Sequence, residues 1–442
     1  MIQLAEAIGG NLGYPFVGEA LELFQAQELF YWKRFQRFGN IFKTRILGKD
    51  IVCLVGCSAN QFVLKDGAGN FSSKIGWSLL EPLLGEGILL QDGERHRRSR
   101  KLMYPSFHEK ILPNYLEIIQ TSAEKCIDNW KTRSPVFLAD ESRSLTLQIA
   151  CRLLLGVSSE GKVIELARYF SELIAGIRTV VRWNVPFTQF GRAVKARNNI
   201  ERFLRSVIEE RRKNPDSDTG SDVLGTLLSA TDESGDRLDD NEIIVQALQL
   251  LFGAHETTAK LLCWSLFELS DRLEWREKIG EEGARVAGEE KISFEAIRGL
   301  TRLDRLLKEV ERLYPPVYSI PRGVIREVEY GGYRIPAGWY VVLSPLLTHR
   351  SSELYTDPHR FDPDRFAPPR EEDKQHPFAL IGFGGGVHHC LGHELARMEI
   401  KVILTVLSRR YRWRVTADLP RGETVFPTNS IERKMRLRLE ET

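Results

Sequence analysis

The sequence lacks any apolar run long enough to cross a membrane. No stretch of about eighteen apolar residues occurs in its 442 residues. The first 21 residues also lack the basic start and the long apolar core of a secretory signal. Net charge is nearly absent too, because 62 basic residues oppose 60 acidic ones. These absences predict a soluble, cytoplasmic protein that has no transmembrane anchor and does not bind nucleic acid.

Cysteine is scarce, and six in a chain of this length do not form a disulfide framework. Five of them lie in strand-like or helical patterns, which predicts burial as small apolar residues: Cys53, Cys57, Cys126, Cys151 and Cys263. Repeats and Gly/Ser-rich linkers are also missing, so residues 1–442 are expected to form a single domain.

Apolar periodicity predicts a mainly helical protein with minor sheet, an α+β architecture. Helical patterns cover about 90–314 and 390–410, and β-rich patterns cover about 40–65 and 322–346. In the first β-rich portion, Gly48-Lys49-Asp50 is the expected turn.

Cys390 differs from the other cysteines because it follows a run of glycines, in Phe383-Gly-Gly-Gly-Val-His-His-Cys390-Leu-Gly392. Glycines permit a loop that passes close to a flat cofactor. A helix is expected to begin at the cysteine, and its free amide donors would lower the thiol pKa. An incidental cysteine is the alternative. Zinc is the rival ligand, through His388, His389 and His393, but no second cysteine or spaced histidine pair is evident.

Residues 239–270 are apolar nearly all round, which predicts a helix that runs through the interior. In its middle lie Glu256 and two threonines, and buried polar groups are costly unless they have partners or a task. The pattern therefore indicates either a satisfied polar pair, with the hydroxyls bonded to the preceding turn, or a functional group.

Two further charged patterns are ambiguous on their own. Glu309 and Arg312 lie on one face of a helix that stops at Pro315-Pro316, and such pairs are common on any helix. Residues 91–101 (QDGERHRRSRK) are strongly basic, which is most often a solvated surface. His96 and Arg100 lie one helical turn apart within that stretch.

The segment Phe383-x-x-Gly386-x-His388-x-Cys390-x-Gly392 resembles the haem-binding signature of the cytochrome P-450 superfamily, which usually has Arg where His388 stands. The resemblance extends over nearly the whole chain. It implies the cytochrome P-450 fold, a long buried helix over haem b, and small sheets towards both ends. Cys390 would be the proximal iron ligand, with Phe383 packed nearby.

The resemblance also assigns roles to the other motifs. Ala254, Glu256 and Thr257 match the dioxygen-binding motif, in which Glu256 and Thr257 deliver protons and Thr257 holds an ordered water. The family more often has Gly at the position of Ala254. Glu309, Arg312 and Arg365, the last within Pro363-Asp-Arg-Phe366, match the family's buried structural triad. The contacts implied for the haem propionates are His96, Arg100, Arg322 and His388.

These matches imply a monooxygenase that hydroxylates an apolar small molecule, and the His96 variant is similar to the retinoic-acid-hydroxylating branch and its soluble bacterial relatives. A retinoid, another isoprenoid or a fatty acid is the expected substrate, with Arg178, Arg182 or Lys74 available to a carboxylate. The segments expected to line the substrate site are largely apolar: 71–90, 170–190, 251–252, 317–320 and the tail near Phe426-Pro427. A peroxygenase, and a haem-binding sensor or carrier, are the alternatives.

Electrons must come from elsewhere, because the chain has neither a Rossmann-type glycine fingerprint nor a four-cysteine cluster. Ferredoxin and ferredoxin reductase are therefore the expected partners. The basic residues at 96–101 and 397–413 are expected to present a positive docking face to an acidic carrier.

Overall fold

The structure is a computed structural model that describes residues 3–25, 27–177, 179, 181–214, 222–286, 292–416 and 434–441. Within these residues, no helix is both long and apolar enough to cross a membrane.

Most of the described chain is helical. The α-helices are α1 Ala20–Gln25, α2 Gln27–Phe38, α3 Cys57–Gln61, α4 Ser73–Gly76, α5 Glu81–Leu84, α6 Gly93–Met103, α7 Leu112–Arg133, α8 Leu138–Leu155, α9 Glu160–Ile177, α10 Gln189–Lys213, α11 Val223–Ser229, α12 Asp240–Ser270, α13 Leu273–Val286, α14 Phe294–Arg298, α15 Thr301–Leu313, α16 Pro345–Thr348, α17 Glu372–Gln375 and α18 His393–Arg410.

The described strands form three small sheets, ordered β2-β3-β9-β6-β4, β1-β8-β7 and β10-β11-β5. Their bounds are β1 Gln3–Leu4, β2 Ile41–Ile46, β3 Lys49–Leu54, β4 Phe71–Ser72, β5 Val136–Phe137, β6 Ile320–Val324, β7 Val328–Tyr330, β8 Tyr333–Ile335, β9 Tyr340–Leu343, β10 Tyr411–Thr416 and β11 Arg436–Glu441. The predicted mainly helical architecture with small sheets near both ends is confirmed.

The first β-rich portion is shorter than predicted and turns one residue earlier. Ile46 pairs with Lys49, so Leu47 and Gly48 form the turn. Both have positive φ, 49° and 75°, which is the conformation of a two-residue hairpin turn that follows the strand twist. Beyond β3 the chain is helical in α3, because Gly56 breaks the strand with a φ of 111° and starts a new element.

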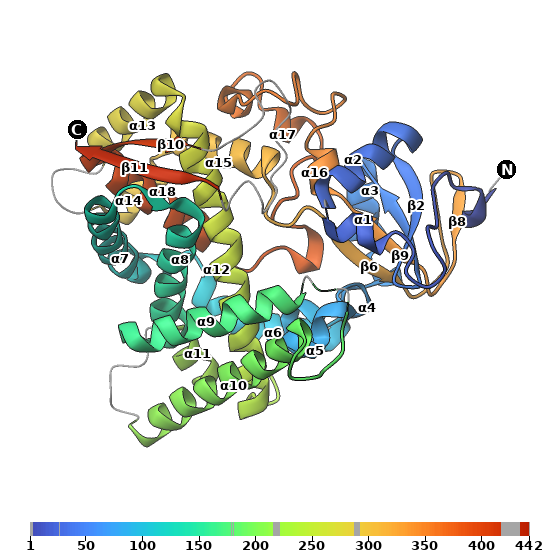
Figure 1. The fold of residues 1–442 in the computed structure, drawn as a ribbon, viewed down its shortest axis with the longest axis horizontal. Coiled ribbons are helices and arrows are strands. Elements are labelled where there is room, and N and C mark those ends of the chain that lie inside the picture. Colours follow the sequence, from blue (N-terminus) through green and yellow to red (C-terminus); the bar gives the residue numbers. More distant parts are fainter. Residues whose placement is uncertain are drawn as a thin grey trace.

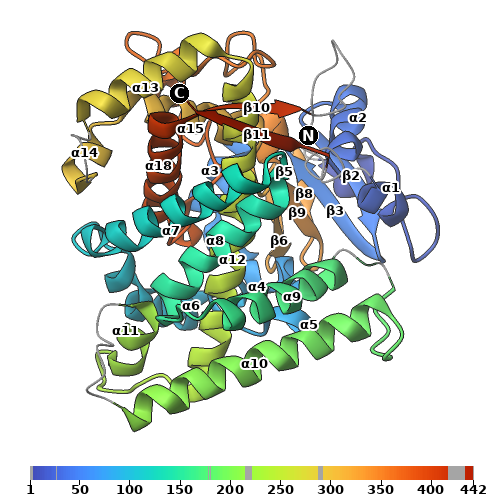
Figure 2. The ribbon, with the colours of Figure 1, turned by 60° about the vertical axis from the view of Figure 1, so that its left-hand side comes forward.

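Helix α12 is the central element, as its apolar sequence predicted. Asp239 and Glu242 form a capping box at its start, and most of its residues are buried. Figure 1 shows α12 passing through the middle of the molecule, between α7 and α8 on one side and the β2–β9 sheet on the other. Figure 2 shows α9 and α10 running side by side across its lower half. Most side chains of α12 therefore lie inside the protein.

Candidate functional site

The chain before Cys390 forms a tight loop around its own backbone. The Cys390 amide donates to the Phe383 carbonyl at 2.9 Å, and the His389 amide donates to Gly386 at 3.1 Å. Gly386 has a φ of 62°, and a Cβ added there would lie 1.9 Å from the Leu64 carbonyl oxygen. Only glycine allows the loop to pass this close to Leu64. The ring of Phe383 packs edge-on against His393, with centroids 4.4 Å apart.

Cys390 precedes the helix instead of opening it, which corrects the expectation from the sequence. Helix α18 begins at His393, after Gly392. The pKa of the Cys390 thiol is raised by burial, although the Gly392 amide and Arg100 act in the opposite direction. The predicted lowering by amide donors is present, but burial outweighs it and the net shift of this pKa is upward. Its side chain is nevertheless accessible. Protein surrounds the thiol, yet solvent can still reach it. The thiol therefore faces an opening inside the molecule.

The middle of α12 is also open on one stripe. Gly253 is exposed, and a Cβ added there would meet nothing within 4 Å. Ala254 and Thr257 are half-buried, whereas Thr258 is buried. The Thr257 hydroxyl donates to the Gly253 carbonyl one turn earlier, at 2.5 Å. The small residues and Thr257 thus form an accessible strip on a helix that is otherwise enclosed.

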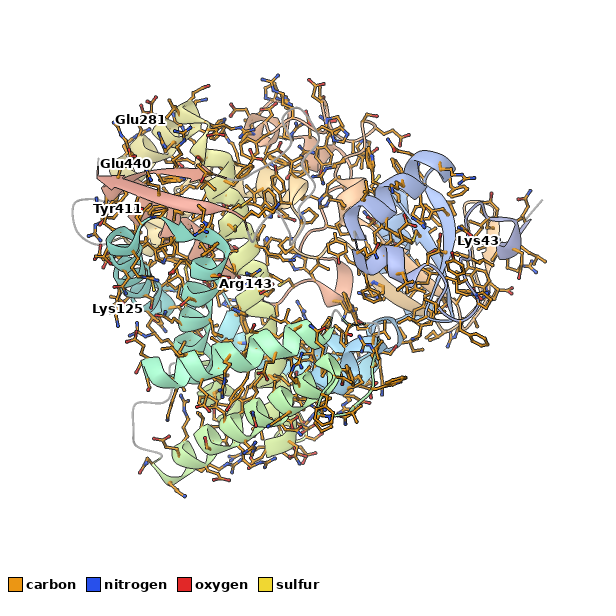
Figure 3. All side chains as sticks on the ribbon, in the orientation of Figure 1. Lys43, Lys125, Arg143, Glu281, Tyr411 and Glu440 are labelled. Atoms are coloured by element: carbon orange, nitrogen blue, oxygen red, sulfur yellow. The ribbon has the colours of Figure 1, made fainter. Side chains whose placement is uncertain are left out.

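Glu256 points away from this strip, towards helix α8. Its carboxylate pairs with Arg143, with 3.0 Å between Arg143 Nε and Glu256 Oε2, and Figure 3 shows Arg143 beside α12. Burial tends to raise the pKa of Glu256, but the charges of Arg143, His255 and Lys260 outweigh it and leave that pKa lowered. Burial lowers the pKa of His255 to about 4. Glu256 is therefore ionised at neutral pH. Arg143 was missed by sequence reasoning, because nothing in the pattern of α8 distinguishes it.

Four basic residues converge next to the cysteine loop. His96 and Arg100 come from α6, Arg322 from β6 and His388 from the loop. The rings of His96 and His388 lie 4.0 Å apart, and Arg100 donates to the His389 carbonyl at 2.8 Å. Burial and the nearby Arg322 lower the pKa of His388 to about 2, and burial lowers that of Arg322 to about 10.

This basic cluster has more positive charge than its neighbours neutralise. Asp92 lies 3.9 Å from His388, and its single negative charge faces the two positive charges of Arg100 and Arg322. Among the described residues, Arg322 donates only to the Pro321 carbonyl. Buried cations without partners are costly, so the cluster suits an anion with two carboxylates, as haem carries. The accessible thiol, the open strip of α12 and this cluster together fit a haem.

Glu309, Arg312 and Arg365 lie together in the interior, and none is exposed. Arg312 Nε and Nη2 donate to Glu309 at 2.7 and 2.8 Å, and Arg365 Nε donates to it at 3.1 Å. Arg365 also donates to Glu372 at 2.7 Å. Glu372 was not anticipated, since it lies in an aperiodic stretch. With it, the buried part of the cluster has two cations and two anions, and the partly exposed Arg370 also pairs with Glu372.

These four side chains bind the segment before the cysteine loop to α15. Arg312 donates to the carbonyls of His349 and Pro358, and Arg365 donates to that of Thr356. The Asp362 amide donates to Glu309 at 2.7 Å. The arginines therefore satisfy the carbonyls of a segment that has little secondary structure of its own.

The two basic stretches expected at a docking face are largely neutralised by the chain's own acids. Arg98 pairs with Asp232 and Lys101 with Glu233. Arg397 and Lys401 are mostly buried and both contact Asp304. Less free positive charge is presented at these positions than the sequence indicated.

The candidate substrate residues have different surroundings. Lys74 pairs with Glu86 on the surface. Arg182 is half-buried and donates to the carbonyls of Leu79 and Ile177. Within the 170–190 segment, Phe170 is buried against the ring of His255, whereas Phe187 is 90% exposed and points outward. Arg178, Phe426 and Pro427 lie outside the described residues.

The zinc alternative has no donor set in the described part of the chain. No group of three or more His, Cys, Asp or Glu side chains there is arranged to hold a metal ion.

Comparisons with known proteins agree with this geometry. The family model described as Cytochrome P450 matches residues 8–431. The chain is 32% identical to "Putative cytochrome P450 120" of Synechocystis sp. over 432 residues, covering 97% of this chain and 96% of that protein. It is 30% identical to "Abscisic acid 8'-hydroxylase 2" of Arabidopsis thaliana, covering 92% and 85%. A solved structure, "Retinoic acid bound cyanobacterial CYP120A1", superposes with a TM-score of 0.91 at 30% identity and covers all of both chains.

The fold and the comparisons define an enzyme that binds haem b and inserts oxygen into organic molecules. The chain belongs to the cytochrome P450 family, whose members are monooxygenases that bind small-molecule substrates and take electrons from redox partners.

Removal of Arg365 tests the buried charge cluster. Arg365→Met leaves Glu309 and Glu372 with one arginine fewer, and this should lower the free energy of unfolding by about 3–5 kcal/mol. Arg370→Met is the control, because Arg370 also contacts Glu372 but is 38% exposed. It should cost no more than about 1 kcal/mol. Urea unfolding measures both, and equal losses in the two variants would contradict the structural role of the cluster.

Proposed function

We propose that this monooxygenase hydroxylates an apolar small molecule, and that the thiolate of Cys390 would hold the iron of its haem. The observation that carries the proposal is the pairing of an accessible, otherwise enclosed thiol with an accessible strip on α12. When bound, the haem supplies dioxygen activation, which a thiolate ligand favours by pushing electron density to the iron. Gly386 lets the loop pass close to Leu64, and Gly392 precedes the first turn of α18.

The basic cluster holds and orients the cofactor in this proposal. Arg100 and Arg322 supply the charge for the two propionates, and His96 and His388 supply ring N–H donors. His388 takes the position where the family usually has Arg.

Glu256 and Thr257 have different roles in the proposed delivery of protons. The Thr257 hydroxyl donates to Gly253, so its oxygen is left to accept a hydrogen bond from a water on the open strip. Glu256 is ionised and faces Arg143, which is itself 24% exposed. Glu256 points away from the open strip, so it would pass a proton inward by turning from Arg143, whose partial exposure connects this pair to solvent. A peroxygenase or a haem-binding sensor needs no such pair, so the pair supports the monooxygenase.

The proposed substrate is an isoprenoid acid such as a retinoid, with fatty acids as the next class. One similar structure has retinoic acid bound, and one similar protein is named as a hydroxylase of abscisic acid; both acids are largely apolar molecules with one carboxylate. Arg182 is the described cation best placed for that carboxylate, because it is half-buried, lies over the ring of Phe190 and retains a buried Nε without a partner. Ferredoxin and ferredoxin reductase are the proposed electron donors.

Thr257→Ala tests the oxygen-side role. The variant should keep its haem but consume several-fold more reducing equivalents per product, because the water on the open strip loses its acceptor. Thr258→Ala is the matched control, because it removes the same hydroxyl and methyl groups from a buried position on the same helix. Unchanged coupling in Thr257→Ala, or equal uncoupling in both variants, would rule out the proposed role.

Spectral titration tests the substrate class. Retinoic acid should shift the Soret band of the wild-type protein, and Arg182→Gln should weaken its apparent affinity about tenfold, corresponding to one charge-assisted hydrogen bond. Retinol, which has no carboxylate, should bind both proteins alike, and Lys74→Gln should change neither ligand's affinity. If retinoids, other isoprenoid acids and fatty acids all fail to shift the spectrum, the proposed substrate class is wrong.

A further inference from the structure

Two glutamines are buried in the first half of α12. Gln246 and Gln249 are 2% and 6% exposed, and a buried amide is costly unless it is hydrogen-bonded. Positions three, four or seven residues apart share a face of a helix, so both glutamines lie on the face that carries Gly253 and Thr257. Gln249 precedes Thr257 by about 12 Å along the helix axis. The glutamines therefore mark the N-terminal end of the accessible strip.

Both side chains bind the backbone of the segment that precedes α6. Gln246 Oε1 accepts the amide proton of Ile88 at 2.9 Å. Gln249 Oε1 accepts that of Leu89 at 2.9 Å, and Gln249 Nε2 donates to the Gly85 carbonyl at 2.8 Å. Three backbone groups of this segment are thus satisfied by one face of α12.

Residues 85–90 contain one short turn of 3-10 helix and little other regular structure. Other side chains satisfy more of their backbone: the Ser73 hydroxyl donates to the Leu89 carbonyl at 2.9 Å. Gln91 Nε2 donates to the Glu86 carbonyl at 2.8 Å, and both Ser73 and Gln91 are buried. The conformation of residues 85–90 is therefore set by the side chains around them, and mostly by those of α12.

The segment crosses α12 at very short range. A Cβ added at Gly87 would lie 2.6 Å from Gln249 Cδ and would displace the glutamine amide. Ile88 is half-buried, as are Phe252 and Ala254 on α12, and all three pack against the main hydrophobic core. The segment therefore lies across the N-terminal end of the strip and leaves apolar side chains partly accessible there.

We propose that Gln246 and Gln249 are positioning residues for the substrate: they fix residues 85–90 across the end of the open strip and thereby limit the length of the apolar molecule that fits over it. The inference rests on the proposed function in one respect, the placement of the substrate over this strip. Neither glutamine contacts the reacting atoms, and their effect passes through the backbone of residues 85–90.

Hydrogen exchange of the holoenzyme tests whether the glutamines hold the segment. Gln249→Leu removes the hydrogen bonds of this side chain, so the amides of residues 85–90 should exchange about tenfold faster. Tyr115→Phe is the matched control, because it removes a buried hydrogen bond elsewhere, from the Tyr115 hydroxyl to the Ser106 carbonyl at 3.1 Å. It should leave exchange in residues 85–90 unchanged.

Unchanged exchange in Gln249→Leu, or an equal increase in Tyr115→Phe, would overturn the inference. Gln246→Leu makes the same test if Gln249→Leu does not fold, because it releases the Ile88 amide and leaves the bonds of Gln249 in place.

Binding of 1-alkylimidazoles to the holoenzyme tests the limit on length. Their ring nitrogen binds haem iron whatever the natural substrate is, and the alkyl chain extends into the surrounding space. In wild-type protein the affinity should rise with each added methylene group until the chain reaches residues 85–90, and then stop rising. In Gln249→Leu the longest chains should bind about tenfold more tightly than in wild type, as burial of about two further methylene groups would give. The short 1-methylimidazole should bind both proteins alike.

Two results of this titration would contradict the limit on length. One is the same dependence on chain length in Gln249→Leu as in wild type, although exchange shows that the segment is released. The other is weaker binding of every imidazole, 1-methylimidazole included, which indicates a general disturbance of the site. Failure of the proposed substrate class is recognised separately, because retinoids and fatty acids would then leave the Soret band of wild-type protein unshifted while the alkylimidazoles still report on length.

Discussion

The buried contact between Glu309 and the two arginines, Arg312 and Arg365, is the constraint on which the site depends. It ties the irregular segment before the cysteine loop to α15, and the arginines satisfy carbonyls that this segment cannot pair within itself. The same helix supports the loop from its other face through Glu311. The position of Cys390 therefore depends on buried charged side chains that are distant from it in the sequence.

Helix α12 places the two polar groups of its centre, the Thr257 hydroxyl and the Glu256 carboxylate, on different faces. It is long and mostly buried, so it runs through the centre of the protein. Small residues leave one strip of its surface accessible. Thr257 lies on that strip, whereas Glu256 is directed to Arg143 on α8. One residue of rotation, about 100° in a helix, thus separates a hydroxyl at the open strip from a carboxylate that is held ionised.

Features that are local in sequence were predictable, and features made by distant partners were not. The periodicity of residues 239–270 gave α12 nearly to the residue, and the glycines before Cys390 indicated a close backbone approach. Arg143 and Glu372 were missed because their partners come from other segments and no spacing marks them. The amide donor expected near Cys390 does act to lower the pKa of the thiol, but burial by the surrounding protein outweighs it, which the sequence does not show.

The central claim is that Cys390 ligates the haem iron, and the most direct measurement is the absorption spectrum of the dithionite-reduced, carbon-monoxide-bound protein. Wild-type protein should give a strongly red-shifted Soret band, because the thiolate donates electron density to the iron. Cys390→His should still bind haem, since imidazole is also an iron ligand, but should lose the red shift. A red-shifted band that persists in Cys390→His, or is absent from wild-type protein that contains haem, would contradict the assignment.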